Sequence, residues 1–179
     1  MIALKDVSFQ YEGCEEGVHE IDLTVRDGEC VVLTGPSGGG KTTLTRLING
    51  LAPSYYQGTK KGDIWINDTE IASLPAWRIG QEIGSVFQDP KSQFFSSELA
   101  GEVAFACENY GMAKQEIRER TDEAIASLGL EALRARPLDV LSSGEKQRVA
   151  VASVYALRPH TYVCDEPTAN LDSEGAVRL

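Results

Sequence analysis

The stretch GPSGGGKT at residues 35–42 is the feature that most limits what this chain can fold into. It matches the pattern G-x-x-x-x-G-K-[ST] and lies between a short apolar run, ECVVLTG (29–35), and a helical pattern, KTTLTRLING (41–50). In such a turn, backbone N–H groups and a helix N-terminus surround phosphate oxygens, while Lys41 reaches the β- and γ-phosphates and Thr42 ligates Mg²⁺. The pattern therefore predicts a strand, a glycine-rich loop and a helix that bind a nucleoside triphosphate.

Periodic patterns on either side of this loop predict an α/β fold. The apolar run before the loop is continuous, which is typical of a strand buried on both faces of a sheet. After the loop, Leu44, Leu47 and Ile48 form one helical face that ends at Gly50. The expected strands are 2–11 and 19–25, which form an antiparallel pair, then 29–35, 62–68, 83–87 and 161–164, and the expected helical segments are 41–50, 92–140 and 145–157.

The composition is that of an ordinary globular domain, because 179 residues with 42% hydrophobic and 25% charged residues suffice for one core. The net charge of −10 argues against a broad nucleic-acid surface. No apolar run is long enough to span a bilayer and no leader opens the sequence, so we expect a cytosolic chain. The cysteines lack metal-site or disulfide spacing and are expected to be reduced and mostly buried: Cys14, Cys30, Cys107 and Cys164.

A second motif, LSSGEKQRVAVAS (141–153), permits two interpretations. Ser142 and Glu145 have the spacing of a capping box at the start of an amphipathic helix, which would be a purely structural role. The motif also precedes TYVCDEPT, an apolar strand pattern that ends in Asp165 and Glu166. Taken alone, this acidic pair could be a polar exit from a strand. Downstream of Lys41, it is the kind of pair that holds magnesium and activates water in nucleotide hydrolases.

In the order of these motifs the chain resembles the ATP-binding cassette (ABC) ATPases over essentially its whole length. GPSGGGKT is similar to the family's phosphate loop, VFQDP to its glutamine loop at Gln88, LSSGE to its signature, YVCDEPT to its magnesium strand and NLD (170–172) to the loop that follows. The resemblance implies a P-loop NTPase (RecA-like) core with an N-terminal antiparallel β part and a helical insertion. It implies a single domain over 1–179, with 1–91 and 145–179 as the nucleotide-binding core and about 92–144 as the helical subdomain.

The resemblance also implies a role for each matching residue, with ATP and Mg²⁺ as cofactors. Glu166 would be the general base, Gln88 and Lys41 would assist catalysis, and the metal would be held by Thr42, Gln88 and Asp165. The nucleotide would be contacted by Tyr11, which stacks on adenine, and by Gly35, Pro36, Ser37, Gly38, Gly39, Gly40, Lys41, Thr42 and Thr43. A second, head-to-tail cassette would contact the triphosphate through its signature residues Ser142, Ser143, Gly144 and Glu145.

Some of these residues depart from the family pattern or have structural alternatives. Ser143 replaces the usual glycine of the signature and Glu145 the usual glutamine. We expect both to be tolerated, because both positions still offer a backbone N–H. Cys164 replaces an aliphatic residue of the magnesium strand, which we expect to be a packing change. Gln88 could instead be a solvated turn residue, and Tyr11 only an aromatic residue at a strand end.

The function that the resemblance implies is the ATPase subunit of a membrane importer. VFQDPKSQFF and ELAGEVAFACENYGM look most like the energy-coupling-factor (ECF) importers of vitamins or metal ions. There, a transmembrane coupling component joins an ATPase pair to a separate substrate-binding membrane protein. The chain would then be peripheral at the cytoplasmic face of the membrane, with Phe94 and Phe95 either in a docking groove or packed among helices.

Two other classes of cassette protein share these motifs. A DNA-repair ATPase would carry a long insertion between Gln88 and Leu141, and the short spacing and acidic charge of this chain disfavour it. A soluble ribosome-associated protein would carry two cassettes, whereas this sequence has one. No nucleic-acid partner is therefore expected.

The last residues predict a cassette that is cut short. SEGAVRL (173–179) has the pattern of a helix start, with Ser173 as N-cap and Val177 and Leu179 opening an apolar face. In the family, this helix is followed by a further core strand and a histidine that contacts the γ-phosphate, and no histidine follows Asp165 here. We therefore expect a fragment that keeps the phosphate site, hydrolyses ATP poorly and has an exposed sheet edge.

Overall fold

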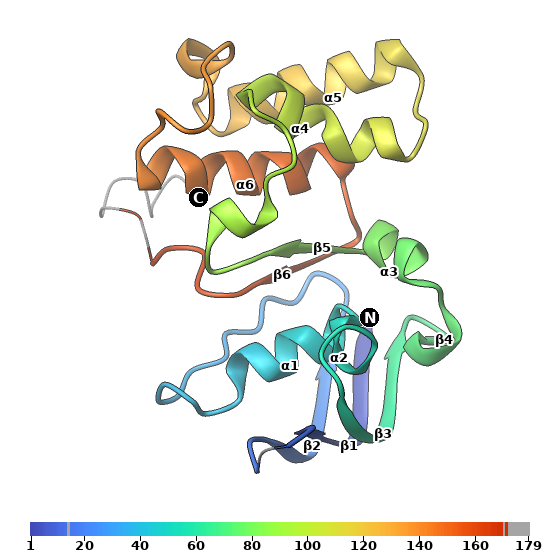
Figure 1. Ribbon diagram of the computed structural model, residues 1–179. Coiled ribbons are helices and arrows are strands. Elements are labelled where there is room, and N and C mark those ends of the chain that lie inside the picture. The colour runs from blue at the N-terminus through green and yellow to red at the C-terminus, as the bar shows by residue number, and fades with distance from the viewer. Residues whose placement is uncertain (14, 170, 172–179) are drawn as a thin grey trace. The chain divides into compact units, whose positions relative to one another are not determined.

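The computed structural model describes residues 1–13, 15–169 and 171 (Figure 1). The chain forms two compact units, Met1–Ile83 and Gly84–Leu179. Cys14, the NLD residues Asn170 and Asp172, and the expected helix start at 173–179 lie outside the described residues. The division into a core and a helical subdomain that the resemblance implies stays a prediction. In the part of the chain that the structure describes, no helix is long and apolar enough to cross a membrane.

The first unit is built on an antiparallel sheet with the strand order β2-β1-β3-β4. Its strands are β1 (Ile2–Tyr11), β2 (Gly17–Val25), β3 (Gly58–Ile66) and β4 (Thr69–Glu70). The predicted antiparallel pair at the start of the chain is confirmed, and β3 begins earlier than the predicted 62–68. The first three side chains of β1 are buried, and after a bulge in the middle of the strand Val7 and Phe9 are buried in alternation, so that the core receives Ile2, Ala3, Leu4, Val7 and Phe9.

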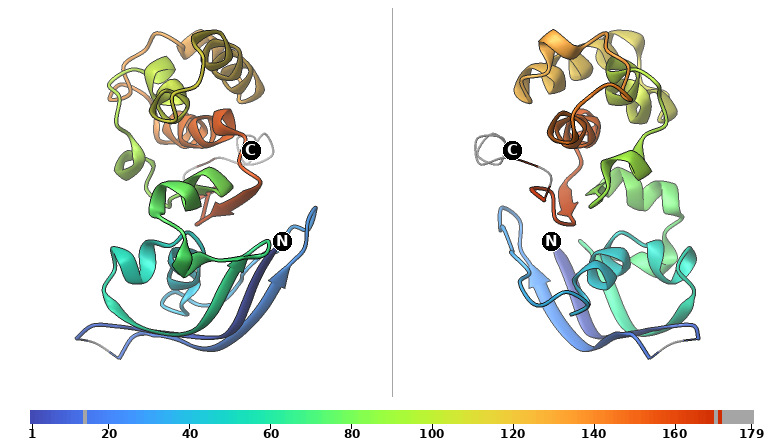
Figure 2. Two further views of the ribbon diagram at one scale, coloured as in Figure 1. Left: turned by 90° about the vertical axis from the view of Figure 1, so that its right-hand side faces the viewer. Right: turned by 60° about the vertical axis from the view of Figure 1, so that its left-hand side comes forward.

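Two helices follow the glycine-rich loop and lie on one face of this sheet (Figure 2). The helix α1 (Lys41–Ile48) buries Leu44, Leu47 and Ile48, which confirms the predicted apolar face. Gly50 has φ 75° and is the N-cap of α2 (Leu51–Ser54). A Cβ at Gly50 would lie 2.7 Å from a methyl group of Ile79, so both the backbone and the packing favour glycine there. The turn η1 (Ile71–Ser73) and the helix α3 (Ala76–Glu82) complete the unit.

The predicted buried strand at 29–35 is wrong. These residues form no strand, and Val32, at the centre of the apolar run, is 77% exposed. A continuous apolar run becomes a buried strand only where neighbouring strands supply its hydrogen bonds. The sheet of the first unit consists of β2, β1, β3 and β4, and its described pairings leave this run outside the ladder. The run therefore enters the glycine-rich loop as exposed chain without regular secondary structure.

The second unit combines a two-stranded sheet with a layer of helices (Figure 1). The strand β5 (Ile83–Val86), which starts at the last residue of the first unit, pairs with β6 (Thr161–Cys164). The helices are α4 (Leu99–Asn109), α5 (Lys114–Ser127) and α6 (Ser143–Leu157), with the turns η2 (Pro90–Gln93) and η3 (Glu131–Leu133) in the connections. The helices share one core, whose buried residues include Leu99, Val103, Ile125, Leu130 and Val149. The predicted helical segments 92–140 and 145–157 are confirmed, with loops between the helices.

Burial in β6 differs from the prediction. The sequence TYVC predicts a strand covered on both faces, but Tyr162 is 46% exposed and Cys164 is also exposed. Side chains alternate between the two faces of a strand, and in this two-stranded sheet only one face of β6 is covered. The cysteines are free thiols, as expected, but among the described ones Cys107 is buried whereas Cys30 and Cys164 are exposed. The expectation of mostly buried cysteines is therefore wrong.

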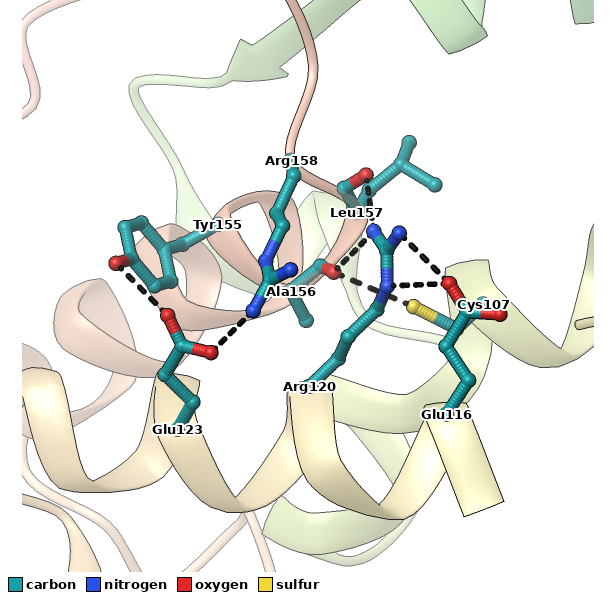
Figure 3. Close-up of polar contacts among 8 residues, drawn as sticks. All are labelled: Cys107, Glu116, Arg120, Glu123, Tyr155, Ala156, Leu157 and Arg158. Carbon is teal, nitrogen blue, oxygen red and sulfur yellow. Dashed lines mark hydrogen bonds and ion pairs between the residues drawn. The ribbon is translucent and has the colours of Figure 1, made fainter. Parts of the chain in front are cut away.

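The C-terminal end of α6 is held by polar side chains of α5 (Figure 3). Arg120 donates from Nη1 to the carbonyl oxygens of Leu157, at 3.0 Å, and Ala156, at 3.4 Å. These carbonyls have no partner within α6, because the last four carbonyls of a helix lack one. Glu116, one turn before Arg120 on α5, orients the guanidinium through a 2.8 Å ion pair. The contact fixes the point at which the chain leaves α6 for β6.

Candidate nucleotide-binding site

The glycine-rich loop ends in a helix start that only glycine can make. Gly40 is the N-cap of α1 and has φ 83°, and a Cβ there would lie 2.6 Å from a methyl group of Val18. Gly38 also has a positive φ, of 77°, and nothing lies within 4 Å of the position of its Cβ. The N–H of Gly39 donates to the carbonyl of Pro36 at 3.1 Å, which closes the turn. The loop therefore presents open space in front of the N-terminus of α1, where the backbone N–H groups favour an anion.

Lys41 contributes the positive charge of this loop. Its Nζ donates to the carbonyl oxygens of Gly35, at 3.0 Å, and Pro36, at 2.9 Å, so the ammonium lies over the loop itself. Thr42 follows in the first turn of α1 and is half-buried, and Thr43 is buried. A cation, a row of backbone N–H groups and a hydroxyl in the next position form the donor set that a triphosphate with Mg²⁺ requires. The residues present fit that group.

Tyr11 lies beside this first turn of α1. Its hydroxyl donates to Thr43 Oγ1 at 3.2 Å and accepts from Arg46 Nη1 at 3.0 Å. The guanidinium of Arg46 lies 3.8 Å from the ring centre of Tyr56, a cation–π contact that fixes it in turn. Tyr11 also borders an open cavity of about 820 Å³ between the β1–β2 hairpin and the start of β3. The position next to the glycine-rich loop agrees with the sequence, while stacking on adenine stays a prediction.

The predicted catalytic residues of the second unit meet where β5 and β6 end. Gln88 Nε2 donates to Glu166 Oε2 at 2.8 Å. The N–H of Asp165 donates to the carbonyl of Val86, the last residue of β5, at 2.9 Å. This hydrogen bond places the acidic pair beside the end of β5. Glu166 has φ 49°, a left-handed conformation that is uncommon for a residue with a side chain and turns the chain sharply after Asp165. The pairing of two short strands therefore assembles Gln88, Asp165 and Glu166.

Gln93 holds the segment that carries Gln88, and sequence reasoning did not single it out. Its Oε1 accepts from the N–H of Phe87 at 3.3 Å, and its Nε2 donates to the carbonyl of Ala150 at 3.2 Å and to Ser153 Oγ at 3.4 Å. One side chain thus ties residues 87–93, the glutamine loop, to α6. No pattern in the sequence distinguishes this glutamine from a solvated one.

Glu102 is a second structural residue that the sequence analysis missed. It is 3% exposed, and its Oε2 accepts from the N–H groups of Phe95 and Ser96, both at 2.8 Å. The carboxylate therefore closes the turn between the glutamine loop and α4. A signal was present, because Glu102 shares the apolar face of α4 with Leu99 and Val103. A carboxylate on an apolar helical face indicates a buried polar partner.

The signature residues open α6 as a complete capping box. Ser142 Oγ accepts from the N–H of Glu145 at 3.3 Å, and Glu145 Oε2 accepts from the N–H of Ser142 at 2.7 Å. This hydrogen bond from the Ser142 backbone lowers the pKa of Glu145, with the Ser142 hydroxyl as the next cause. Ser143 and Gly144 form the first turn. The capping interpretation is confirmed, and contact with a triphosphate of another chain stays a prediction.

The predicted site residues thus fall into three groups. The first unit brings together the residues expected to bind the nucleotide within one chain: Tyr11, Gly35, Pro36, Ser37, Gly38, Gly39, Gly40, Lys41, Thr42 and Thr43. The second unit brings together Gln88, Asp165 and Glu166, and separately places the residues from Ser142 to Glu145 at the start of α6.

A glycine-rich loop at a helix N-terminus, in an α/β chain, defines a P-loop nucleotide-binding protein. The chain belongs to the ABC transporter family, whose sequence model matches residues 18–169. Two ABC transporter ATP-binding proteins of Treponema denticola are similar to it. One is 43% identical over 180 residues, which cover 100% of this chain and 37% of the relative, and the other is 41% identical over 173 residues, which cover 96% and 35%. The chain therefore spans about a third of the length of these relatives.

Solved structures give the same fold. CbiO1 of Clostridium perfringens, part of the ABC transporter complex CbiONQ, matches with a TM-score of 0.84 and 31% identity over 98% of this chain and 69% of that one. The ATP-binding cassette MJ0796, as a dimer bound to ADP and Pi, matches with a TM-score of 0.85 and 28% identity over 99% of this chain and 79% of that one. The predicted fold class, a P-loop NTPase of the ABC type with an N-terminal antiparallel sheet and added helices, is confirmed.

Proposed function

We propose that this chain is the ATP-binding and ATP-hydrolysing part of a membrane importer. The proposal rests on the loop of residues 35–40 and on Lys41, which follows it. The conformations of Gly38 and Gly40 and the ammonium of Lys41 form an anion-binding site at the start of α1. Membership of the ABC transporter family supports the same chemistry. The backbone N–H groups and Lys41 hold the triphosphate, Thr42 and Asp165 hold Mg²⁺, and Tyr11 stacks on the base.

Hydrolysis is assigned to Glu166, with Gln88 as its partner. A carboxylate that acts as general base must lie within hydrogen-bond reach of the water it activates and must be oriented. The hydrogen bond from Gln88 supplies an orienting contact in the second unit. Bound Mg²⁺ supplies charge neutralisation at the phosphates. Gln88 donates from its amide to Glu166 in the structure described here, and we assign its carbonyl oxygen to the metal and the water.

Two cassettes work as a head-to-tail pair in this proposal. The N-terminus of α6 offers Ser142 and the backbone N–H groups of the first turn, a suitable contact for a γ-phosphate held by another chain. The similarity to MJ0796, which forms a dimer with ADP and Pi, supports pairing. The pair closes only when the triphosphate bridges the two chains, so association is weak without nucleotide.

Coupling to a membrane partner is assigned to the surface around the glutamine loop. Phe95 is 75% exposed and stacks on Phe105, with ring centres 4.8 Å apart, so an aromatic surface follows the loop directly. The similarity to CbiO1, a part of the CbiONQ complex, supports an ECF-type importer with a transmembrane coupling component and a separate substrate-binding protein. The chain then lies at the cytoplasmic face of the membrane, and the transported vitamin or metal ion is selected by the other protein.

Steady-state ATP turnover tests the reaction. Wild type and Glu166→Gln are compared with Glu108→Gln, an exposed glutamate of α4, as the matched control. Loss of a general base lowers turnover by about 10²–10⁴-fold. Glu166→Gln should retain MgATP binding and shift the chain to a dimer in sedimentation, because the bound triphosphate is no longer consumed. Turnover in Glu166→Gln equal to that of the control variant would overturn the assignment of the base.

A separate experiment tests the membrane role. The tagged chain is incubated with membranes from cells that express ECF-type coupling components, and Phe95→Ser is compared with Tyr162→Ser, which removes another exposed aromatic residue. We expect wild type and Tyr162→Ser to bind the membranes and Phe95→Ser to bind them several-fold less. Equal binding of all three proteins, or recovery of wild type on ribosomes alone, would contradict the docking surface.

A further inference from the structure

Lys146 is a buried lysine near the start of α6. It is 9% exposed, although the long side chain of a lysine usually reaches water. Its Nζ donates to the backbone carbonyl oxygens of Asp139, at 3.0 Å, and Leu141, at 2.7 Å. None of the ion pairs among the described residues includes Lys146. The ammonium therefore has neutral carbonyl groups as partners, whereas a buried charge is commonly paired with an opposite charge.

The two carbonyls belong to the turn that leads into α6. Side chains on a helix point back toward its N-terminus, so Lys146 reaches residues five and seven positions before it. The hydrogen bond within the turn, from the N–H of Leu141 to the carbonyl of Leu138, is long, at 3.4 Å. Leu138 and Leu141 are buried, whereas Val140 between them is 62% exposed. The bonds from Lys146 are shorter and charge-assisted, so they fix the path of the turn.

Ser142 follows this turn directly, so the path of the turn determines where its hydroxyl lies. Ser142 Oγ accepts from the N–H of Glu145 at 3.3 Å, and an accepting hydroxyl still has a hydrogen to donate. Ser143 and Gly144 open α6, and the first N–H groups of a helix have no partner within it. The hydroxyl and these N–H groups form one set of donors, whose position depends on the turn that Lys146 holds.

The charge of Lys146 lies at the end of α6 where a cation is least favourable. The N-terminus of a helix carries a partial positive charge, and the ammonium points back toward it. An anion in front of Ser142 and Gly144 would be attracted by both charges. The placement of the lysine is therefore favourable when an anion binds at this helix end.

We propose that Lys146 is a positioning residue for the contact between two cassettes. It holds the turn of residues 139–142 so that the Ser142 hydroxyl and the first N–H groups of α6 meet the phosphate bound by the other chain. Its ammonium stays under the turn and does not touch the phosphate. This inference rests on the head-to-tail pairing of the proposed function, and it adds the residue that shapes the donor set.

The first test is hydrogen exchange of residues 138–146 in the nucleotide-free chain. Lys146→Met removes the donor and keeps the unbranched side chain, and Lys114→Met, on the exposed surface of α5, is the matched control. The N–H groups of Leu141 and Glu145 should exchange several-fold faster in Lys146→Met than in wild type and the control. Lys146→Gln takes its place, with the same expectation, if Lys146→Met does not fold. Unchanged exchange would show that Lys146 does not hold the turn, and would overturn the proposal.

The second test is association driven by MgATP. Each change is placed in the Glu166→Gln chain, and sedimentation measures the dimer Kd at a temperature well below the Tm of every variant. Lys146→Met should raise the dimer Kd at least about tenfold, while Lys114→Met and Lys146→Arg, which keeps a charged donor, should stay within about threefold of Glu166→Gln. The affinity of the single chain for MgATP should stay within about threefold in all of them, because Lys146 lies outside the glycine-rich loop.

The outcomes separate a positioning role from a purely structural one. A lower Tm in Lys146→Met with an unchanged dimer Kd would show that the lysine only stabilises the chain, and would overturn the proposal. Equal losses of association in Lys146→Met and Lys146→Arg would show that the charged donor is not what matters, and would overturn it too. Failure of Glu166→Gln itself to form a dimer with MgATP would instead refute the proposed pairing.

Discussion

The amide of Gln88 and the carboxylate of Glu166, 78 residues apart in the sequence, are joined by a 2.8 Å hydrogen bond. Gln88 follows β5 and Glu166 follows β6, so the pairing of these two strands brings the residues together. The bond gives the carboxylate a fixed donor on one oxygen. This contact matters for catalysis because a general base acts only when it is oriented toward the water it activates.

Replacing Gln88 by a second carboxylate should change the pH dependence of ATP turnover. In Gln88→Glu two carboxylates lie within hydrogen-bond distance, and such a pair raises the pKa of one member. A base with a raised pKa is protonated over a wider range, so the acid limb of the profile of turnover against pH should move to higher pH. Gln88→Leu should lower turnover, by about tenfold, without moving the limb. Superimposable profiles for Gln88→Glu and Gln88→Leu would contradict the contact.

The capping box at the start of α6 should make stability depend on the charge of Glu145. Its pKa is lowered from the ordinary value of 4.5, so its contribution is present above pH 4.5 and is lost as the pH falls through the lowered pKa. Glu145→Gln keeps the same hydrogen bond but does not titrate. We expect wild type to be more stable at pH 7 by roughly 0.5 kcal/mol, and the difference to shrink as the pH falls below 4.5. A difference in Tm that stays constant from pH 7 to pH 3 would count against this assignment.

The contact between α5 and the end of α6 should contribute measurably to stability. Arg120→Met removes the donor to the carbonyls of Ala156 and Leu157 (Figure 3) and should lower the free energy of unfolding by roughly 1–2 kcal/mol. Arg118→Met is the matched control, because the Arg118 side chain is 79% exposed. Urea unfolding measures both variants. Equal midpoints for the two would show that Arg120 does not cap the helix.

Local patterns were sufficient for the elements whose partners are close in sequence. The antiparallel hairpin of β1 and β2, the apolar face of α1 and the capping box at Ser142 follow from alternation, helical spacing and cap chemistry, and all three are confirmed. Glycine is the residue that most readily adopts a positive φ, so the glycines of the phosphate-loop motif indicated a turn of this kind. Gly38 and Gly40 both have a positive φ.

Properties that depend on distant segments were not predictable in the same way. The run at 30–33 has the composition of a buried strand, but composition does not say whether a neighbouring strand pairs with it. Tyr162 is exposed for a similar reason, because the composition of its strand does not show whether both faces of the strand are covered. Gln93, in η2, is joined to α6 by its hydrogen bond to the carbonyl of Ala150, and no local pattern in the sequence predicts that contact.

Calorimetric titration of the chain with MgATP measures whether residues 35–43 bind the nucleotide. Lys41→Ala is the decisive variant, and Lys114→Ala, an exposed lysine of α5, is its control. The ammonium of Lys41 makes charge-assisted hydrogen bonds to the phosphates, and losing them should weaken binding about 10- to 100-fold. Wild type and Lys114→Ala should bind MgATP with equal Kd, and Lys41→Ala should bind it at least about tenfold more weakly. An unchanged Kd in Lys41→Ala would show that residues 35–43 do not hold the phosphates.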